Sequence, residues 1–271
     1  MRSVLARIVA GADPYPESMS EVAELEAVCE RAWPPYERLE LDGAVLRFTH
    51  GFTRRANSAR VDAGGDDLEG LIARAEREYR SRGLRPGFRL TPLTPRPFER
   101  LLRERGYEVD TEAVVMVADA LPETGARDPG DGIELAATLG DEWLRVFQAI
   151  ERKWPPEQDP GARWVLGSGD APRRFALARV AGAPAATGYG RIEGDWLYIA
   201  SVATFPERRR LGLARAVSDR LFAWGAGEGA RRAILQAETK NRAAQALYAA
   251  LGFEPRYTYQ DFVPGRAIPT D

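Results

Sequence analysis

The stretch FPERRRLGLARAVSDRLFAWG, residues 205–225, decides the fold of this 271-residue chain. It follows a β-like run, residues 196–204, and its apolar residues then recur with helical spacing. A strand, an Arg/Gly-rich turn and a helix in this order predict an anion-binding turn. The first N–H groups of a helix have no partner inside the helix and carry a partial positive charge. Gly212 lets a phosphate approach the backbone closely, and residues 208–210 add guanidinium groups that suit phosphate oxygens.

A second segment follows at a fixed distance. ILQAETKNRAAQALYAALGFEP, residues 234–255, predicts a strand, a short turn and a helix that ends at Leu251-Gly252-Phe253. The turn before it has the spacing Arg209, two residues, Gly212, one residue, Ala214. Together these segments resemble the GNAT N-acetyltransferase superfamily, whose acetyl-CoA turn is Q/R-x-x-G-x-G/A between the fourth strand and the third helix. The resemblance covers residues 133–263, about half of the chain.

The resemblance implies an α/β (α+β) fold with a mixed, mostly antiparallel sheet flanked by helices. It also implies acetyl-CoA as co-substrate, without a metal. In family members the core strand and its neighbour separate, which frees strand N–H groups for the pantetheine arm and the thioester. Asn241 matches the side chain that binds the pantetheine arm, although it could equally cap the helix that it opens. The remaining residues implied to bind the cofactor are Val202, Ala203, Thr204, Arg208, Arg209, Arg210, Leu211, Gly212, Leu213, Ala214 and Tyr248.

Transfer of an acyl group to an amine needs a base and an acid. A lysine-like amine has a pKa near 10.4, so a carboxylate usually has to take its proton before it attacks. The candidates are Glu193 and Asp195 in the turn before the core strand, and Glu238 after the next strand; each of them could also be a plain surface residue. Tyr248 matches the family position of the acid that protonates the leaving thiolate, and its alternative is a tyrosine that packs on the core.

The composition favours a cytoplasmic enzyme and excludes several classes. A net charge of −2 offers no global attraction to nucleic acid or to an anionic membrane, and the arginine run at residues 208–210 is too local for nucleic-acid binding. No apolar run is long enough to span a membrane, and residues 1–15 are too short and polar for a secretory signal. Cys29 and His50 are the only residues of their kinds, which excludes a Cys/His zinc site.

The chain divides near LPETGARDPGDG, residues 121–132, which lacks periodicity and predicts a linker. The expected organisation is a degenerate GNAT-like unit over residues 1–120, the linker, and a catalytic GNAT domain over residues 133–271. In the second half, strands are expected at 132–135, 174–180 and 187–192 and a further one at 196–204. Helices are expected at 140–152, 211–228 and 241–251. The Pro/Gly-rich stretch 155–169 would cover the acceptor site.

The first half aligns with the second at a constant offset of 146 residues without gaps. Gly106 falls on Gly252, Tyr107 on Phe253 and Phe52 on Tyr198. This register predicts a duplication. The front unit lacks the cofactor residues, because Gly212 falls on Asp66. We therefore expect no CoA binding of this kind in the front unit.

The front unit contains a polar run instead, GFTRRANSARV, residues 51–61, which we interpret as a strand. Strand alternation would place Thr53, Arg55 and Asn57 on one face. Arg55 and Asn57 are candidate acceptor-site residues. The alternative is an edge strand whose charges are solvated or pair across the interface between the units.

The sequence thus favours a tandem GNAT protein that moves an acetyl or short acyl group from acetyl-CoA to a primary amine by direct transfer. The acceptor would be a small-molecule or peptide amine, and the protein a monomer or homodimer that binds neither nucleic acid nor membrane. Two alternatives stay open. One is a tandem synthase that acylates a small thiol precursor, and the other is a non-catalytic CoA-binding regulator. The sequence does not identify the acceptor.

Overall fold

The computed structural model describes residues 18–62, 66–125, 132–151 and 154–265. The α-helices of these residues are α2 (Met19–Ala32), α3 (Leu68–Ser81), α4 (Pro97–Glu104), α5 (Asp141–Glu151), α6 (Asp159–Gly167), α7 (Leu213–Gly227) and α8 (Arg242–Ala250). The strands are β1 (Glu37–Leu41), β2 (Ala44–Phe48), β3 (Ala59–Val61), β4 (Phe88–Leu90), β5 (Tyr107–Ala118), β6 (Ile133–Ala136), β7 (Arg173–Val180), β8 (Ala183–Glu193), β9 (Trp196–Thr204), β10 (Arg232–Glu238) and β11 (Glu254–Pro264). Three short 3₁₀ helices complete the list: η1 (Arg54–Ala56), η2 (Pro156–Gln158) and η3 (Pro206–Arg208).

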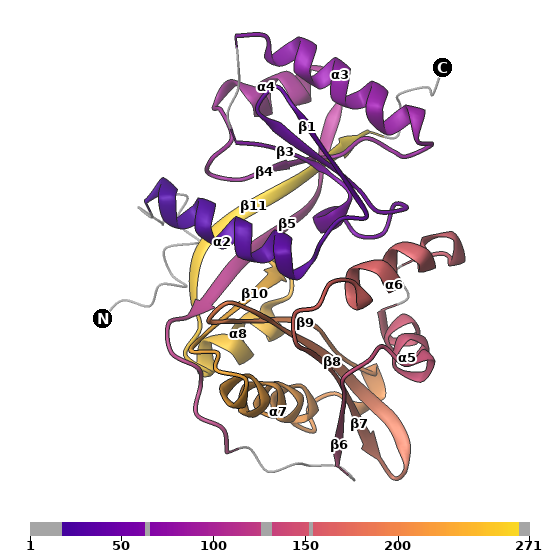
Figure 1. Ribbon diagram of the computed structural model, residues 1–271, viewed down its shortest axis with the longest axis vertical. Coiled ribbons are helices and arrows are strands. Elements are labelled where there is room, and N and C mark those ends of the chain that lie inside the picture. Colours follow the sequence, from indigo (N-terminus) through magenta and orange to yellow (C-terminus); the bar gives the residue numbers. More distant parts are fainter. Residues whose placement is uncertain (1–17, 63–65, 126–131, 152–153, 266–271) are drawn as a thin grey trace.

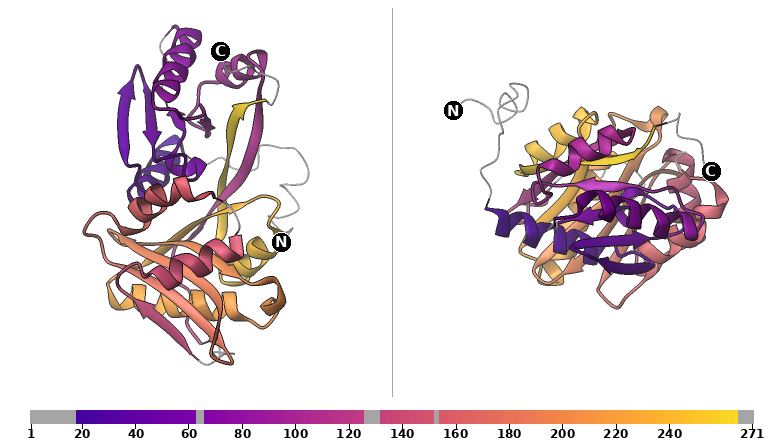
Figure 2. Two further views of the ribbon diagram at one scale, coloured as in Figure 1. Left: turned by 90° about the vertical axis from the view of Figure 1, so that its right-hand side faces the viewer. Right: turned by 90° about the horizontal axis from the view of Figure 1, so that it is seen from above.

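The described strands form one continuous sheet in the order β1-β2-β3-β4-β11-β5-β10-β9-β8-β7-β6. The fold class is confirmed, because the pairs are antiparallel except for β3 with β4 and β9 with β10. The two halves do not keep separate sheets, however. The long strands β5 and β11 run side by side between the upper and lower parts of the molecule (Figures 1 and 2), and each lies next to a strand of the other half.

Three apolar cores lie against this sheet. In the second half, α7 and α8 cover one face of β8–β10, and α7 approaches β8 closely at Gly188. The helices α2, α5 and α6 cover the opposite face. The third core joins α3 and α4 to β2, β3 and β4 of the first half. The face of β9 and β10 that is opposite α7 is therefore covered partly by the first half, through α2.

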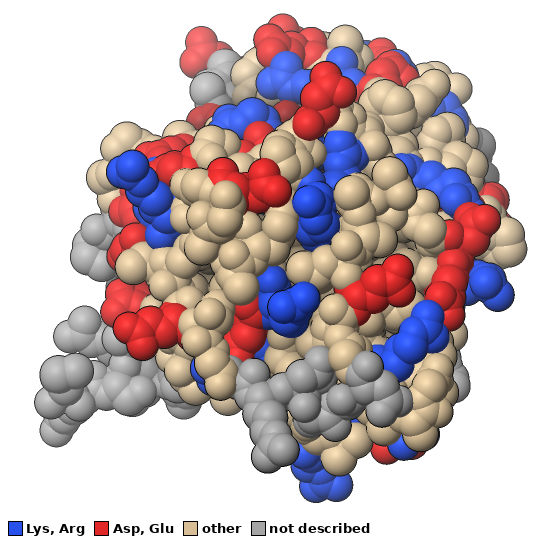
Figure 3. Space-filling view, turned by 60° about the horizontal axis from the view of Figure 1, so that its bottom comes forward, with Lys and Arg blue, Asp and Glu red and all other residues tan. Residues whose placement is uncertain are grey.

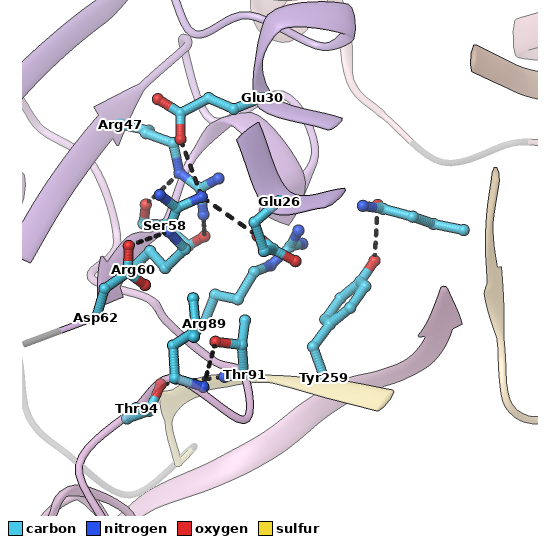
Figure 4. Close-up of polar contacts among 12 residues, drawn as sticks. Glu26, Glu30, Arg47, Ser58, Arg60, Asp62, Arg89, Thr91, Thr94 and Tyr259 are labelled. Carbon is cyan, nitrogen blue, oxygen red and sulfur yellow. Dashed lines mark hydrogen bonds and ion pairs between the residues drawn. The ribbon is translucent and has the colours of Figure 1, made fainter. Parts of the chain in front are cut away.

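A buried polar seam fastens α2 to the first-half strands (Figure 4). The Arg60 guanidinium lies 3.4 Å from a Glu26 oxygen and 3.2 Å from a Glu30 oxygen. Glu26 also accepts a 2.7 Å hydrogen bond from the Tyr257 hydroxyl of β11. Because a buried carboxylate is tolerated only when it is paired and hydrogen-bonded, this seam fixes the position of α2 relative to both halves.

The structure confirms the duplication from α3 onward. Adding 146 carries α3 onto 214–227, α4 onto 243–250 and β5 onto 253–264, which match α7, α8 and β11. The proposed equivalence of Phe52 with Tyr198 is wrong, because Phe52 lies in a turn and Tyr198 in β9. By connectivity, the counterpart of β9 is β3, since each precedes a helix and then pairs in parallel with the next strand. The ungapped register therefore ends before α3.

The prediction of a strand over residues 51–61 is also wrong. Only β3 is extended; Thr53 has a φ of +48° and residues 54–56 form η1. The cause is local hydrogen bonding, which competes with a ladder. The Asn57 Oδ1 accepts the N–H groups of Thr49 (2.9 Å) and Gly51 (3.1 Å), and the Ser58 hydroxyl donates to the carbonyl of Arg54 (2.7 Å). The run is a compact turn that leads into β3.

Elements of the second half follow the predictions to within a few residues. The helix expected at 140–152 is α5, and Arg152 lies outside the described residues. The stretch 155–169 contains η2 and α6. Of the expected linker, residues 126–131 lie outside the described residues, as do residues 1–15. Within the described ranges, no helix is long and apolar enough to cross a membrane.

Candidate active site

The strands β9 and β10 separate halfway along their length. Their parallel pairing runs from Trp196 opposite Arg232 to Ile199 opposite Leu235 and then stops. β9 continues to Thr204 and β10 to Glu238 without further pairing to each other. We call this separation of the two strands the β9/β10 cleft; beyond Ile199 and Leu235 the main-chain groups of each strand have no ladder partner in the other.

A β-bulge in β9 sets the direction of its main-chain groups beyond Ala200. Between the pairs Thr187–Ala203 and Tyr189–Ala200, two residues of β9 lie opposite one residue of β8, and Ser201 has a φ of +54°. Beyond the bulge, the Phe205 N–H bonds the carbonyl of Ala185 on β8 (3.1 Å). Because alternate residues direct their N–H groups to opposite edges, Ala203 faces β8, whereas Val202 and Thr204 face the cleft.

The Arg/Gly-rich turn leads directly into α7. Gly212 is the N-cap residue with a φ of +80°, and no side chain among the described residues caps this helix. Arg210 has a φ of +63°. Glycine is favoured at 212 because it accepts the left-handed conformation, a stronger reason than the close approach inferred from the sequence. The turn leaves the first α7 amides without a capping acceptor, and the side chains of residues 208–211 flank them in solvent or partly exposed.

In α3, the first-half helix that corresponds to α7, a carboxylate of the chain itself already occupies the N-terminus. Asp67 caps α3, and its carboxylate accepts the Gly70 N–H at 2.8 Å. A carboxylate at the N-cap competes with any phosphate for the same donors.

Tyr248 lies between α8 and α7. The residue is 5% exposed, its ring packs edge-on against Phe253, and its hydroxyl lies 3.4 Å from the Ser218 Oγ of α7. Burial raises the pKa of Tyr248 to about 12, and the hydrogen bond with Ser218 opposes this shift. The phenol is therefore neutral at physiological pH and can donate a proton.

The candidate carboxylates lie at opposite ends of the strands. Glu193 precedes Trp196, forms ion pairs with Arg191 (2.8 Å) and Arg31 (3.4 Å), and belongs to the closed end of the sheet. Asp195 accepts hydrogen bonds from the Nε and Nη2 of Arg232, each at 3.0 Å. Glu238 ends β10 at the open side of the β9/β10 cleft, where Lys240 lies 2.9 Å away. Only Glu238 is near the cleft.

Asn241 and the two first-half candidates have defined contacts. Asn241 caps α8, and its Oδ1 accepts the Ala244 N–H at 3.1 Å. Asn57 is 1% exposed and braces the turn at residues 49–51. Arg55 reaches the second half, where its Nη1 donates to the Tyr198 hydroxyl at 3.0 Å. Of the two acceptor-site candidates, Arg55 alone points toward β9.

Sequence reasoning missed several residues around the cleft. Ser201 forms the bulge, Ser218 contacts Tyr248, and Gln236 lies just beyond the last paired residue of β10. Gln236 could have been singled out, since it is a polar residue inside the apolar run ILQA. The Thr204 Oγ1 is buried and has no hydrogen-bond partner among the described residues, another polar group at the open end of β9.

The charges visible in Figure 3 are mixed, with Lys and Arg interspersed among Asp and Glu on that face. Across the described residues, no group of three or more His, Cys, Asp or Glu is placed to hold a metal ion.

Comparisons with known proteins agree with this geometry. The family model described as the C-terminal region of the probable histone acetyltransferase Rv0428c matches residues 19–261. The chain is 28% identical to the probable histone acetyltransferase Rv0428c of Mycobacterium tuberculosis (strain ATCC 25618 / H37Rv), over 94% of this chain and 78% of the relative. It is 26% identical to YobR of Bacillus subtilis (strain 168), an uncharacterized N-acetyltransferase, over 88% of this chain and 96% of the relative.

Solved structures share the fold. A GCN5-related N-acetyltransferase from Kribbella flavida superposes with a TM-score of 0.67 at 17% identity, covering 92% of this chain and 97% of that one. A tandem GNAT protein from the clavulanic acid biosynthesis pathway gives 0.58 at 15% identity, with coverages of 92% and 89%. Since the family model spans nearly the whole described chain, the protein belongs to the family of the Rv0428c C-terminal region and is a GNAT-type acetyltransferase with a tandem arrangement.

Proposed function

We propose that the protein transfers an acetyl or other short acyl group from acyl-CoA to a primary amine by direct attack, with one CoA site in the second half. The observation that carries this proposal is the β9/β10 cleft beside the uncapped N-terminus of α7. The pantetheine arm would lie in the cleft and bond the N–H groups of Val202 and Thr204. The pyrophosphate would sit on the amides of residues 211–214, with Arg208, Arg209 and Arg210 around it.

Each chemical step has a candidate group. The amine nitrogen attacks the thioester carbonyl carbon, the new C–N bond forms, and the C–S bond breaks. Glu238 would take the proton of the amine, directly or through a water, because Glu193 and Asp195 lie near the closed end. Trp196 and Val202 are six residues apart on β9, which is about 20 Å along a strand. Tyr248 would protonate the CoA thiolate, and Asn241 would add a contact to the pantetheine arm.

Direct transfer is favoured over an acyl-cysteine intermediate. Cys29 is the only cysteine, it is 5% exposed, and burial in an apolar core raises its pKa to about 12. A thiol with such a pKa supplies almost no nucleophilic thiolate at neutral pH. We also propose two units, residues 1–120 and residues 133–271. Their strands join in one sheet, because β5 of the first unit pairs with β10 and β11 of the second.

The proposal is tested by incubating the protein with acetyl-CoA and a panel of primary amines and small thiols. Released CoA and acylated products are measured by mass spectrometry. N-acetyl products that appear in equal amounts with CoA support the proposal, and initial rates should depend on both substrates through a ternary complex. Binding of acetyl-CoA without turnover would identify a non-catalytic CoA-binding protein, and S-acyl products alone would identify a thiol acyltransferase. Either result contradicts the proposal.

A further inference from the structure

Arg55 brings a positive charge with few protein partners to the face of the sheet that α2 covers. Its guanidinium lies over the Trp33 ring, 5.1 Å from the ring centre, and donates one hydrogen bond, to the Tyr198 hydroxyl. Guanidinium has five N–H donors. Among the described residues no carboxylate forms an ion pair with Arg55, and no further hydrogen bond engages its other donors.

Arginines that are buried more deeply than Arg55 are compensated, and so is the half-buried Arg60. Arg89 binds both carboxylate oxygens of Asp261, at 2.9 and 3.0 Å, and Arg60 contacts three carboxylates (Figure 4). Arg47 uses its Nε and Nη2 on the carbonyl and hydroxyl of Ser58. A guanidinium removed from bulk water is costly unless an anion or strong acceptors satisfy it. Arg55 is part-exposed and has no anion beside it among the described residues, so its other donors remain open to water or to an anionic ligand.

Arg55 reaches the sheet near the point where the β9/β10 cleft opens. Its hydrogen-bond acceptor, Tyr198, directly precedes Ile199, the last β9 residue that pairs with β10. Gln236 follows Leu235, the last β10 residue that pairs with β9, but its side chain is engaged within the core. Its Oε1 accepts from the Tyr259 hydroxyl at 3.0 Å, and it hydrogen-bonds the Cys29 thiol, which opposes the rise in the pKa of that thiol caused by burial.

We propose that the acceptor amine carries a carboxylate, which binds Arg55. This inference rests on the proposed function, since it assigns the acceptor class of the same site. Tyr198 and Val202 are four positions apart, about 13 Å along the strand. A contact of roughly 3 Å at the carboxylate, and another at the Val202 N–H, whose partner is the thioester carbonyl, leave at most roughly 7 Å between the carboxylate and the amine. This span fits an ω-amino acid no longer than 6-aminohexanoate, or the side-chain amine of free lysine.

The test compares matched acceptors. Acetylation rates are measured for ω-amino acids from glycine to 6-aminohexanoate, and for 6-aminohexanamide, which keeps the amine and the chain but has no charge. We expect kcat/KM for 6-aminohexanoate to exceed that for the amide by about tenfold or more, the scale of one charge-assisted contact. Arg55→Gln should remove this preference, so that the two acceptors are acetylated with similar kcat/KM.

Two controls keep the result interpretable. Arg100→Gln removes one positive charge from an exposed ion pair with Glu104 on α4 and should preserve the preference. Saturation-transfer NMR with 6-aminohexanoate reports binding without turnover, and it should lose its signal in Arg55→Gln. If Arg55→Gln does not fold, the ratio of kcat/KM for 6-aminohexanoate to that for its amide in the wild-type protein still tests whether the site binds a carboxylate.

The outcomes separate the two proposals. Equal kcat/KM for 6-aminohexanoate and its amide in the wild-type protein would leave N-acetylation standing and overturn the carboxylate site. A preference that survives in folded Arg55→Gln would also overturn it. NMR binding that depends on Arg55, without acetylation of any amine, would support the carboxylate site and refute the proposed function.

Discussion

Gly212→Asp is the change that tests the cofactor turn most sharply. The substitution puts a side chain on a residue with a φ of +80°, which costs about 1 kcal/mol because L-residues avoid this region. An aspartate at an N-cap regains part of that cost by accepting the first N–H groups of α7. The free energy of unfolding should therefore fall by no more than about 1 kcal/mol, and Tm by about 2–4 °C.

Acetyl-CoA binding should suffer far more than stability. The new carboxylate occupies the donors that the pyrophosphate would use, and it repels the phosphate charges. Two charge-assisted hydrogen bonds are worth about 3–6 kcal/mol, so Kd should rise by about 10²- to 10⁴-fold. Isothermal titration calorimetry measures this directly, with about one site per chain expected for the wild-type protein.

Gly83→Asp is the matched control. Gly83 also has a positive φ, +66°, and a Cβ there would meet nothing within 4 Å, but it lies beyond the end of α3 in the first half. It introduces the same charge with a similar backbone cost, and acetyl-CoA affinity should not change. An unchanged Kd in folded Gly212→Asp, or an equal loss in both variants, would refute the assignment of this turn.

Three further predictions concern catalysis and stability. Tyr248→Phe keeps the ring packing and removes the hydroxyl, so kcat should fall by about 10²-fold or more at constant acetyl-CoA Kd; normal kcat would assign Tyr248 to packing alone. Arg89→Leu should lower the free energy of unfolding by about 3–5 kcal/mol in urea titrations, because it leaves the Asp261 carboxylate buried and unpaired. The double variant with Asp261→Leu should recover most of that loss, and an equal loss in both variants would contradict a buried ion pair. Burial raises the pKa of Tyr248 and of Tyr259 to about 12, so folding favours their neutral forms. The resulting stability is fully present below the ordinary tyrosine pKa near 10 and is lost as the pH rises toward 12. In urea titrations the free energy of unfolding should fall by about 1.4 kcal/mol per pH unit per tyrosine over this range, and a flat profile up to pH 12 would contradict their burial.

The sequence was most informative where local signals agree. The run through β9, the turn and α7 combines strand alternation, a glycine at a left-handed position and helical periodicity, and each of these depends on nearby residues alone. The same holds for α8, whose N-cap Asn241 marks its start. The register between the halves could be found because α3 and α7 conserve their spacing to the strands that follow.

Long-range features could not be predicted in this way. Nothing in the periodicity of β5 indicates that it pairs with β10 and β11 of the other half, since pairing partners depend on how the whole sheet closes. The turn at residues 51–58 was misinterpreted because the polar side chains that suggested a functional strand bond the backbone instead, as Asn57 does. The bulge at Ser201 is equally hidden, because a serine carries no signal for a positive φ.

The central claim is that one acyl-CoA binds in the β9/β10 cleft with its pyrophosphate on the N-terminus of α7. A crystal structure of the acetyl-CoA complex tests it most directly. The account predicts one cofactor per chain, with the pyrophosphate hydrogen-bonded to the amides of residues 211–214 and the thioester carbonyl near the N–H of Val202. Cofactor bound at the N-terminus of α3, or outside the space between β9 and β10, would contradict it.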